Sequence, residues 1–272
     1  MKTPRNTRNS GRRTVAALLA VALLAAIAVG LTVAFNKLHD VWLEQCVIND
    51  IARQVTVTSG KMVKADAIKE AFGLHEGVNL ARVDFAARRE EALKKYPTIR
   101  SIDISRHLPD RVALTVIERE PTTRVNLVGK HQDSGLVADS EGVVFPCRRG
   151  TAMLPIIRES KAASTAVGQR LAGRSFAALK LVELCRNPEF SELGLLEVDV
   201  SKPDYLIAIL GSYSQAKIAW EGMNDPEDPH LKELEAQLRH LSNAIRATSA
   251  TSAKVWDVTL PNRVFSDNKG IN

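Results

Sequence analysis

The chain has 272 residues, of which 45% are hydrophobic and 25% charged, so it has material for one or two modest domains plus a membrane segment and is not disordered overall. Five basic residues before residue 14 supply most of the net charge of +6, which leaves the remainder close to neutral and gives no sign of nucleic-acid binding. The three cysteines are too far apart for a metal or redox motif; either Cys147 and Cys185 pair in an oxidising compartment, or all three remain free.

The first element in the chain is an apolar segment without a charge at residues 15–35. As a helix it spans roughly 31 Å, about the hydrocarbon thickness of a bilayer. A cleaved signal peptide is the alternative, with Ala26 and Ala28 at cleavage-like positions, but the apolar run continues beyond them and favours an uncleaved anchor. Basic residues precede the segment and Asp40 and Glu44 follow it. Residues 1–14 are therefore expected in the cytoplasm, residues 15–35 in the membrane and the residues after about 36 outside, beginning with a membrane-proximal segment at residues 36–50.

A small domain is predicted after the anchor. Residues 51–58 alternate apolar and polar side chains and predict a strand. Residues 65–72 predict a helix ended by Gly73, and a second helix runs from a cap at Asp84 to residue 96, where Pro97 stops it. Residues 98–106 and 110–118 alternate again, with a Pro-Asp turn between them. The order is strand, helix, helix, strand, strand.

Several motifs accompany this order. Residues 77–80 read Gly-x-Asn-Leu, a Tyr-Pro pair precedes the second strand, and two further runs follow at residues 106–112 and 116–121. After a membrane anchor, these motifs resemble the POTRA domain of the FtsQ/DivIB family of bacterial cell-division proteins. The motif residues are Arg106, Pro109, Glu118, Arg119, Glu120 and Pro121. Without that resemblance, a string of charges at a strand end is usually solvated surface.

The rest of the chain predicts a second domain of strands and helices. Strands are expected at residues 123–127, 135–145 (around a turn in which Gly142 has positive φ), 154–157, 195–200, 205–210, 216–220, 254–260 and 263–266. Helices are expected at residues 175–185 and, after an acidic proline-broken loop at residues 224–229, at residues 231–245. The leucine stripe of the last helix covers only about two heptads, which favours packing on the sheet over a coiled coil.

The resemblance implies an α+β fold with a single N-terminal transmembrane helix. A small β-α-α-β-β POTRA domain occupies residues 51–121, a mixed β-sheet domain with flanking helices occupies residues 122–266, and a polar tail occupies residues 267–272. The implied protein is a single-pass component of the inner membrane at the division septum. It binds FtsB-like and FtsL-like single-pass proteins and helps control septal peptidoglycan synthesis. The final hairpin is the expected partner-binding edge, with Val255, Trp256, Asp257, Val258, Arg263, Val264, Phe265 and Ser266.

Motifs for catalysis are not found in the sequence. It contains no GxSxG, HExxH, P-loop or GxGxxG, and its six histidines have no ligand spacing. We therefore predict no catalytic, cofactor or metal residues and no small-molecule substrate. A calcium loop at residues 139–145 is disfavoured because valines and a phenylalanine occupy its later positions. Two alternatives remain, a membrane-anchored periplasmic enzyme and a POTRA component of an outer-membrane assembly or secretion system.

Overall fold

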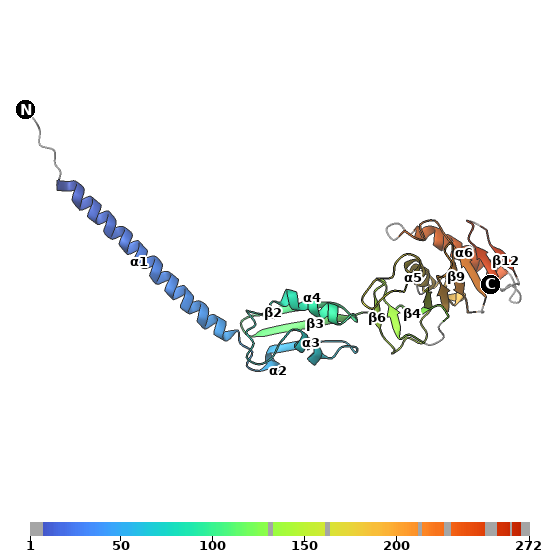
Figure 1. The fold of residues 1–272 in the computed structure, drawn as a ribbon, viewed down its shortest axis with the longest axis horizontal. Helices are drawn as coiled ribbons and strands as arrows, with labels where there is room; N and C mark the ends of the chain where they lie inside the picture. Colours follow the sequence, from blue (N-terminus) through green and yellow to red (C-terminus); the bar gives the residue numbers. More distant parts are fainter. Residues whose placement is uncertain are drawn as a thin grey trace, which may run out of the picture. The chain divides into compact units, whose positions relative to one another are not determined.

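A computed structural model describes residues 8–129, 133–160, 164–211, 214–225, 230–247, 255–261 and 263–267, with the side chains of the first helix from Leu23 onward (Figure 1). It contains two compact units. The first comprises residues 1–58, 64–89 and 103–115, and the second comprises residues 59–63, 90–102 and 116–272. Residues 1–7 of the predicted arm, 226–229 of the acidic loop and 268–272 of the predicted tail lie outside the described residues.

Helix α1 (Arg8–Gln45) runs for 38 residues without interruption (Figure 1). Within the described residues it is the one helix long and apolar enough to cross a membrane, with the qualifying stretch at Leu23–Gln45. The segment expected between the anchor and the first domain is therefore largely a continuation of the same helix.

The predicted β-α-α-β-β order is present. It consists of β1 (Val55–Thr58), α3 (Ala65–Ala71), α4 (Phe85–Lys95), β2 (Ile99–His107) and β3 (Arg111–Glu118). The sheet has the order β1-β3-β2, and β1 pairs in parallel with β3. Asp84 caps α4 as expected, since its carboxylate accepts hydrogen bonds from the amides of Ala86 and Ala87.

One local expectation differs. Residues 51–54 form a single helical turn, α2 (Ile51–Gln54), and the strand begins only at Val55. The physical reason is Asp50, whose carboxylate accepts hydrogen bonds from the amides of Ala52 and Arg53 and so starts a helical turn.

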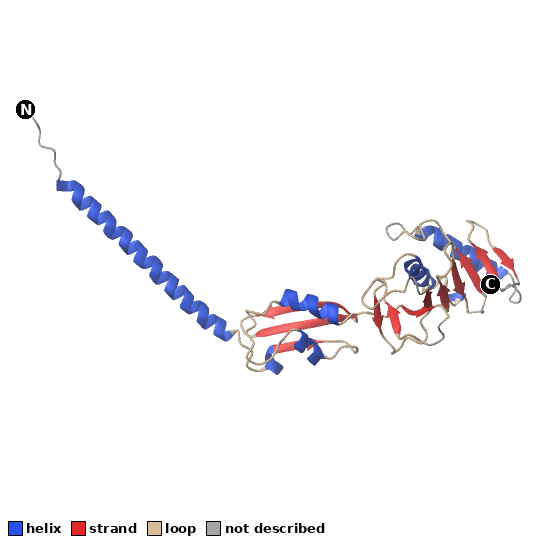
Figure 2. Ribbon diagram, viewed as in Figure 1, coloured by secondary structure: helices blue, strands red, loops and turns tan. Residues whose placement is uncertain are grey.

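A sheet with helices packed beside it forms the body of the second unit (Figure 2). The sheet has nine strands in the order β12-β11-β10-β9-β8-β7-β4-β5-β6. Its strands are β4 (Thr123–Leu127), β5 (Leu136–Ala138), β6 (Val144–Pro146), β7 (Ile156–Glu159), β8 (Glu197–Asp199), β9 (Leu206–Ile209), β10 (Gln215–Ile218), β11 (Val255–Val258) and β12 (Phe265–Asp267). The strand predicted at residues 154–157 thus lies two residues later, as β7.

Two helices make the crossovers that parallel strands require. Helix α5 (Arg174–Cys185) connects the parallel pair β7 and β8, and α6 (Leu231–Ala247) connects the parallel pair β10 and β11. The short 3-10 helix η2 (Ser191–Leu193) precedes β8. The leucines of α6 at positions 234, 238 and 241 are fully buried in the core, which agrees with packing on the sheet. Cys46, Cys147 and Cys185 are all free.

Candidate functional site

The predicted partner-binding hairpin lies at one end of the nine-stranded sheet. Strand β11 pairs in parallel with β10 and antiparallel with β12, and β12 is the last strand in the order. Of the predicted residues, Val255 to Val258 form β11, Phe265 and Ser266 begin β12, and Arg263 and Val264 precede it. Asp267, which the sequence assigned to the polar tail, completes β12.

The side chains of this hairpin divide by face. Trp256 and Val258 belong to the buried core, and Val264 packs against it. All three residues of β12 are exposed, and 53% of Phe265 is accessible. Ser266 lies opposite Trp256, and Phe265 lies opposite Asp257. Of the predicted set, Val255, Trp256 and Val258 are buried, Asp257 and Val264 are partly buried, and Arg263, Phe265 and Ser266 are exposed.

The opposite end of the sheet is covered. Strand β6 is the terminal strand there, but the amide of Val144 donates to the carbonyl of Gln169 at 2.9 Å and the amide of Gly168 donates to the carbonyl of Val144 at 2.7 Å. An antiparallel bridge joins Val143 to Arg170. We call residues 166–171 the β6 strap. It bonds to both the amide and the carbonyl of Val144, the first residue of β6, and so covers the beginning of this edge strand, a common protection of sheet edges.

The predicted POTRA motif residues are divided between the two compact units. Arg106 lies over the ring of Phe85 at 4.6 Å, and Pro109 is in the turn between β2 and β3, both in the first unit. Glu118, Arg119, Glu120 and Pro121 belong to the second unit.

The carboxylate of Glu118 anchors a loop, a role that its place in a run of charged residues does not predict. Its carboxylate accepts hydrogen bonds from the amides of Lys61, Met62 and Val63 at 2.9, 2.9 and 2.8 Å. A Cβ on Gly60 would collide with a carboxylate oxygen of Glu118. The glutamate thus holds the loop after β1, and the glycine leaves room for it.

The side chain of Arg119, the residue that follows β3, forms hydrogen bonds with the turn between β5 and β6. Its guanidinium donates to the carboxylates of Asp139 and Glu141, while its amide donates to the carbonyl of Thr98. Arg100 also contacts Glu141, at 2.6 Å. Hydrogen bonds from Arg100 and then Arg119 lower the pKa of Glu141 below its usual value. This is a fixed ionic cluster and not a site with a free reactive group.

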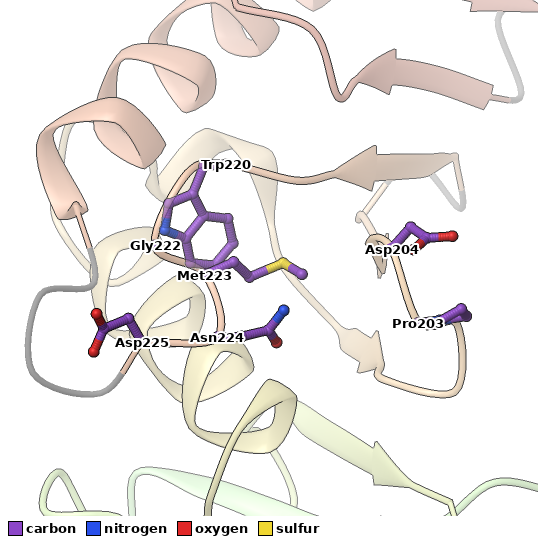
Figure 3. Close-up of a pocket in the computed structure, with 7 residues that line it drawn as sticks. All are labelled: Pro203, Asp204, Trp220, Gly222, Met223, Asn224 and Asp225. Atoms are coloured by element: carbon purple, nitrogen blue, oxygen red, sulfur yellow. The ribbon is translucent and has the colours of Figure 1, made fainter.

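A cleft of roughly 680 Å³ opens beside the end of β10 (Figure 3). Trp220 and Met223 form its apolar wall, and Asp204, Asn224 and Asp225 supply its polar groups. Figure 3 shows no nucleophile paired with a base among the residues drawn.

Three residues near one another could each offer a ligand atom to a metal ion. The ligand atoms of Glu221, His230 and Glu233 lie within 4.8 Å of one another. The sequence does not reveal this grouping, because Glu221 is nine positions before His230.

The chain thus combines a β-α-α-β-β module with a preceding helix that is long and apolar enough to cross a membrane, which is the class of an α+β protein with a candidate N-terminal anchor helix. Residues 52–119 match the family model described as "POTRA domain, FtsQ-type". The chain is also similar to curated proteins named "Cell division protein FtsQ". It is 32% identical over 88 residues to that of Corynebacterium glutamicum, which covers 32% of this chain and 37% of the relative.

Two further relatives align over more of the chain. The protein of Koribacter versatilis is 25% identical over 201 residues, 70% of this chain and 55% of its own length. That of Streptomyces bingchenggensis is 25% identical over 197 residues, 71% of this chain and 70% of its own length. The alignments with the first two relatives span 37% and 55% of those proteins. These findings confirm the resemblance: the chain is related to the FtsQ cell division proteins and carries their type of POTRA domain.

Proposed function

We propose that this chain is a bitopic scaffold of the bacterial cell-division machinery that acts by binding and not by catalysis. Its partners are other single-pass division proteins, FtsB-like and FtsL-like, and through them it helps control septal peptidoglycan synthesis. The N-terminus lies in the cytoplasm and both folded parts lie in the periplasm at the septum. The names of the relatives, the apolar α1 and the basic residues before it support this assignment.

The observation that carries the proposal is the difference between the two ends of the nine-stranded sheet. The β6 strap covers one terminal strand, whereas β12 pairs only with β11 within the described residues. An uncovered edge presents backbone donors and acceptors to an extended partner segment, which adds to the sheet as a further strand. Phe265 adds an apolar contact on the accessible side of that edge.

The gain from strand addition can be bounded from the length of β12. A three-residue strand offers about two or three outward backbone hydrogen bonds, each of about 0.5–1.5 kcal/mol net. Burial of an exposed phenylalanine contributes about another 1–2 kcal/mol. Loss of the edge should therefore weaken partner binding by about 100-fold or more, since 1.4 kcal/mol corresponds to tenfold.

The test compares Phe265→Pro with Phe265→Ala in the full chain, measured by capture of an FtsB-like protein from the same organism. Proline removes an amide and disrupts the edge, whereas alanine removes only the ring. We expect Phe265→Ala to weaken capture by about tenfold and Phe265→Pro to weaken it far more, with near-ultraviolet circular dichroism unchanged in both. Full-strength capture by folded Phe265→Pro protein would refute the edge mechanism.

A further inference from the structure

The chain that follows β10 is anchored to the core on both sides of Glu221. Trp220 and Met223 belong to the buried core, and the amide of Met223 donates to the carbonyl of Trp220 at 3.3 Å. Glu221 itself is exposed. The backbone at Glu221 is therefore held in place by its neighbours, whereas its carboxylate is accessible.

The start of α6 contacts the same segment. The amide of Glu233 donates to the carbonyl of His230 at 2.9 Å, so His230 stands directly before the first turn of the helix. One carboxylate oxygen of Glu233 accepts a hydrogen bond from the amide of Glu221 at 3.2 Å. The two parts of the chain that carry Glu221 and Glu233 are thus joined by a hydrogen bond of the fold itself.

Three ligand atoms converge at this contact, because those of Glu221, His230 and Glu233 all lie within 4.8 Å of one another. Ligand atoms at about 2.0–2.2 Å from one ion are roughly 3.4 Å apart in a tetrahedral site, so rotations of these accessible side chains are enough to place all three on one ion. Neither carboxylate forms a salt bridge with a lysine or arginine among the described residues. A cation between them would therefore relieve their mutual repulsion.

A buried polar atom next to this contact points to a ligand independently. Gln237 is 3% exposed and lies one turn after Glu233 on the same face of α6. Its side-chain amide donates to the carbonyl of Ala219, two residues before Glu221, at 2.8 Å. Its Oε1 atom, in contrast, has no hydrogen-bond partner within the described chain. Buried acceptors are rarely left unpaired, and water on a metal ion supplies a donor that the protein does not.

We propose that Glu221, His230 and Glu233 bind one divalent transition-metal ion of the Zn²⁺ type, which fastens the start of α6 to the segment after β10. An imidazole nitrogen beside two carboxylates suits Zn²⁺, whereas Ca²⁺ and Mg²⁺ prefer oxygen ligands alone. Three protein ligands leave the remaining position to water. The site departs from the expectation, drawn from sequence spacing, that the chain has no metal-ligating residues.

The ion would act on the crossover that positions β11. Helix α6 connects β10 with β11, and β11 is the strand that pairs with β12. An ion that holds Glu221 to the start of α6 stabilises this crossover, because the ligands come together only in the folded chain. The site is independent of the proposed function, since all three ligands belong to the second unit and none to the β12 edge.

The experiment titrates Zn²⁺ into the full chain in detergent, without a polyhistidine tag and after removal of metal with EDTA. All variants carry Cys147→Ser, because an accessible thiol is itself a zinc ligand. We expect one ion per chain, and affinity at least about tenfold weaker in Glu221→Gln and in His230→Ala. The matched control is His240→Ala, which removes another exposed histidine of α6 and should leave the affinity unchanged. Ca²⁺ and Mg²⁺ should not compete.

Hydrogen exchange then locates the ion. Zn²⁺ should slow the amides of residues 233–236, in the first turns of α6, by about tenfold in the parent chain and not in His230→Ala. The amides of β6 should not respond. Absence of binding at about 100 µM Zn²⁺, equal affinity in the parent chain and both ligand variants, or equal binding of Ca²⁺ would each overturn the proposal. Near-ultraviolet circular dichroism should be the same in all variants, because the replaced side chains at positions 221 and 230 are exposed.

Discussion

Replacing Glu118 by alanine should release the loop after β1. The three amides that its carboxylate binds, those of Lys61, Met62 and Val63, would have to find water instead. Two of these bonds are exposed and the bond from Val63 is partly buried, so the loss for each is at the lower end of the range for bonds to a charged group. We estimate a local loss of about 2–3 kcal/mol for the three together.

Hydrogen exchange is the direct assay because it reports each segment separately. A local loss of about 2 kcal/mol corresponds to roughly 30-fold faster exchange of the amides of residues 61–63. Glu118→Gln keeps one acceptor oxygen without the charge and should give an intermediate acceleration. Gly60→Ala should act in the same direction, since its Cβ would collide with the carboxylate of Glu118.

The matched control is Glu120→Ala, which removes an exposed glutamate two residues away in the same motif. It should leave the exchange of residues 61–63 unchanged. If Glu118→Ala also left it unchanged, or if both variants accelerated it equally, the carboxylate would not be the anchor of this loop.

Three further outcomes follow from the second unit. Hydrogen bonds from Arg100 and Arg119 lower the pKa of Glu141, so its stabilising effect is present above the ordinary carboxyl pKa and is lost as pH falls through the lowered pKa. The difference in Tm between the parent chain and Glu141→Gln should therefore narrow as the pH is lowered below the ordinary pKa of a glutamate. Gly168→Pro removes the amide that bonds to Val144 and cannot adopt the φ of +84° found there, so it should open the β6 edge and cause aggregation, measurable by light scattering. Burial raises the pKa of Cys185 to about 12, so iodoacetamide should label Cys147 in the folded protein and spare Cys185 until denaturant is added.

Local patterns were sufficient for most elements. Alternation and helical periodicity predicted the β-α-α-β-β order, and the turn before β6 has the positive φ, +80°, expected at Gly142. The α2 turn was missed because residues 51–58 alternate like a strand, and the hydrogen bonds by which Asp50 starts the turn are not part of that pattern. A side chain that satisfies backbone amides nearby can override a strand pattern.

The contacts that organise the candidate site were not accessible from local sequence. The sequence assigns Glu118 to a charged strand end, but its partners lie more than 50 positions earlier in the chain. The parallel pairing of β10 with β11 depends on the crossover through α6. The β6 strap was missed for a similar reason, since residues 166–171 have no strand pattern of their own. The polar residues after position 266 predicted that the last strand forms an edge of the sheet, whereas no local pattern predicted that the other edge is covered.

The central claim is that β12 accepts a strand from a partner, and hydrogen exchange with and without an FtsB-like protein tests it most directly. Among the amides of Phe265–Asp267, those not bonded to β11 should exchange at least about tenfold more slowly in the complex, while those of β6 stay unchanged. A complex that forms with full affinity and leaves every β12 amide exchanging as in the free protein would contradict the account.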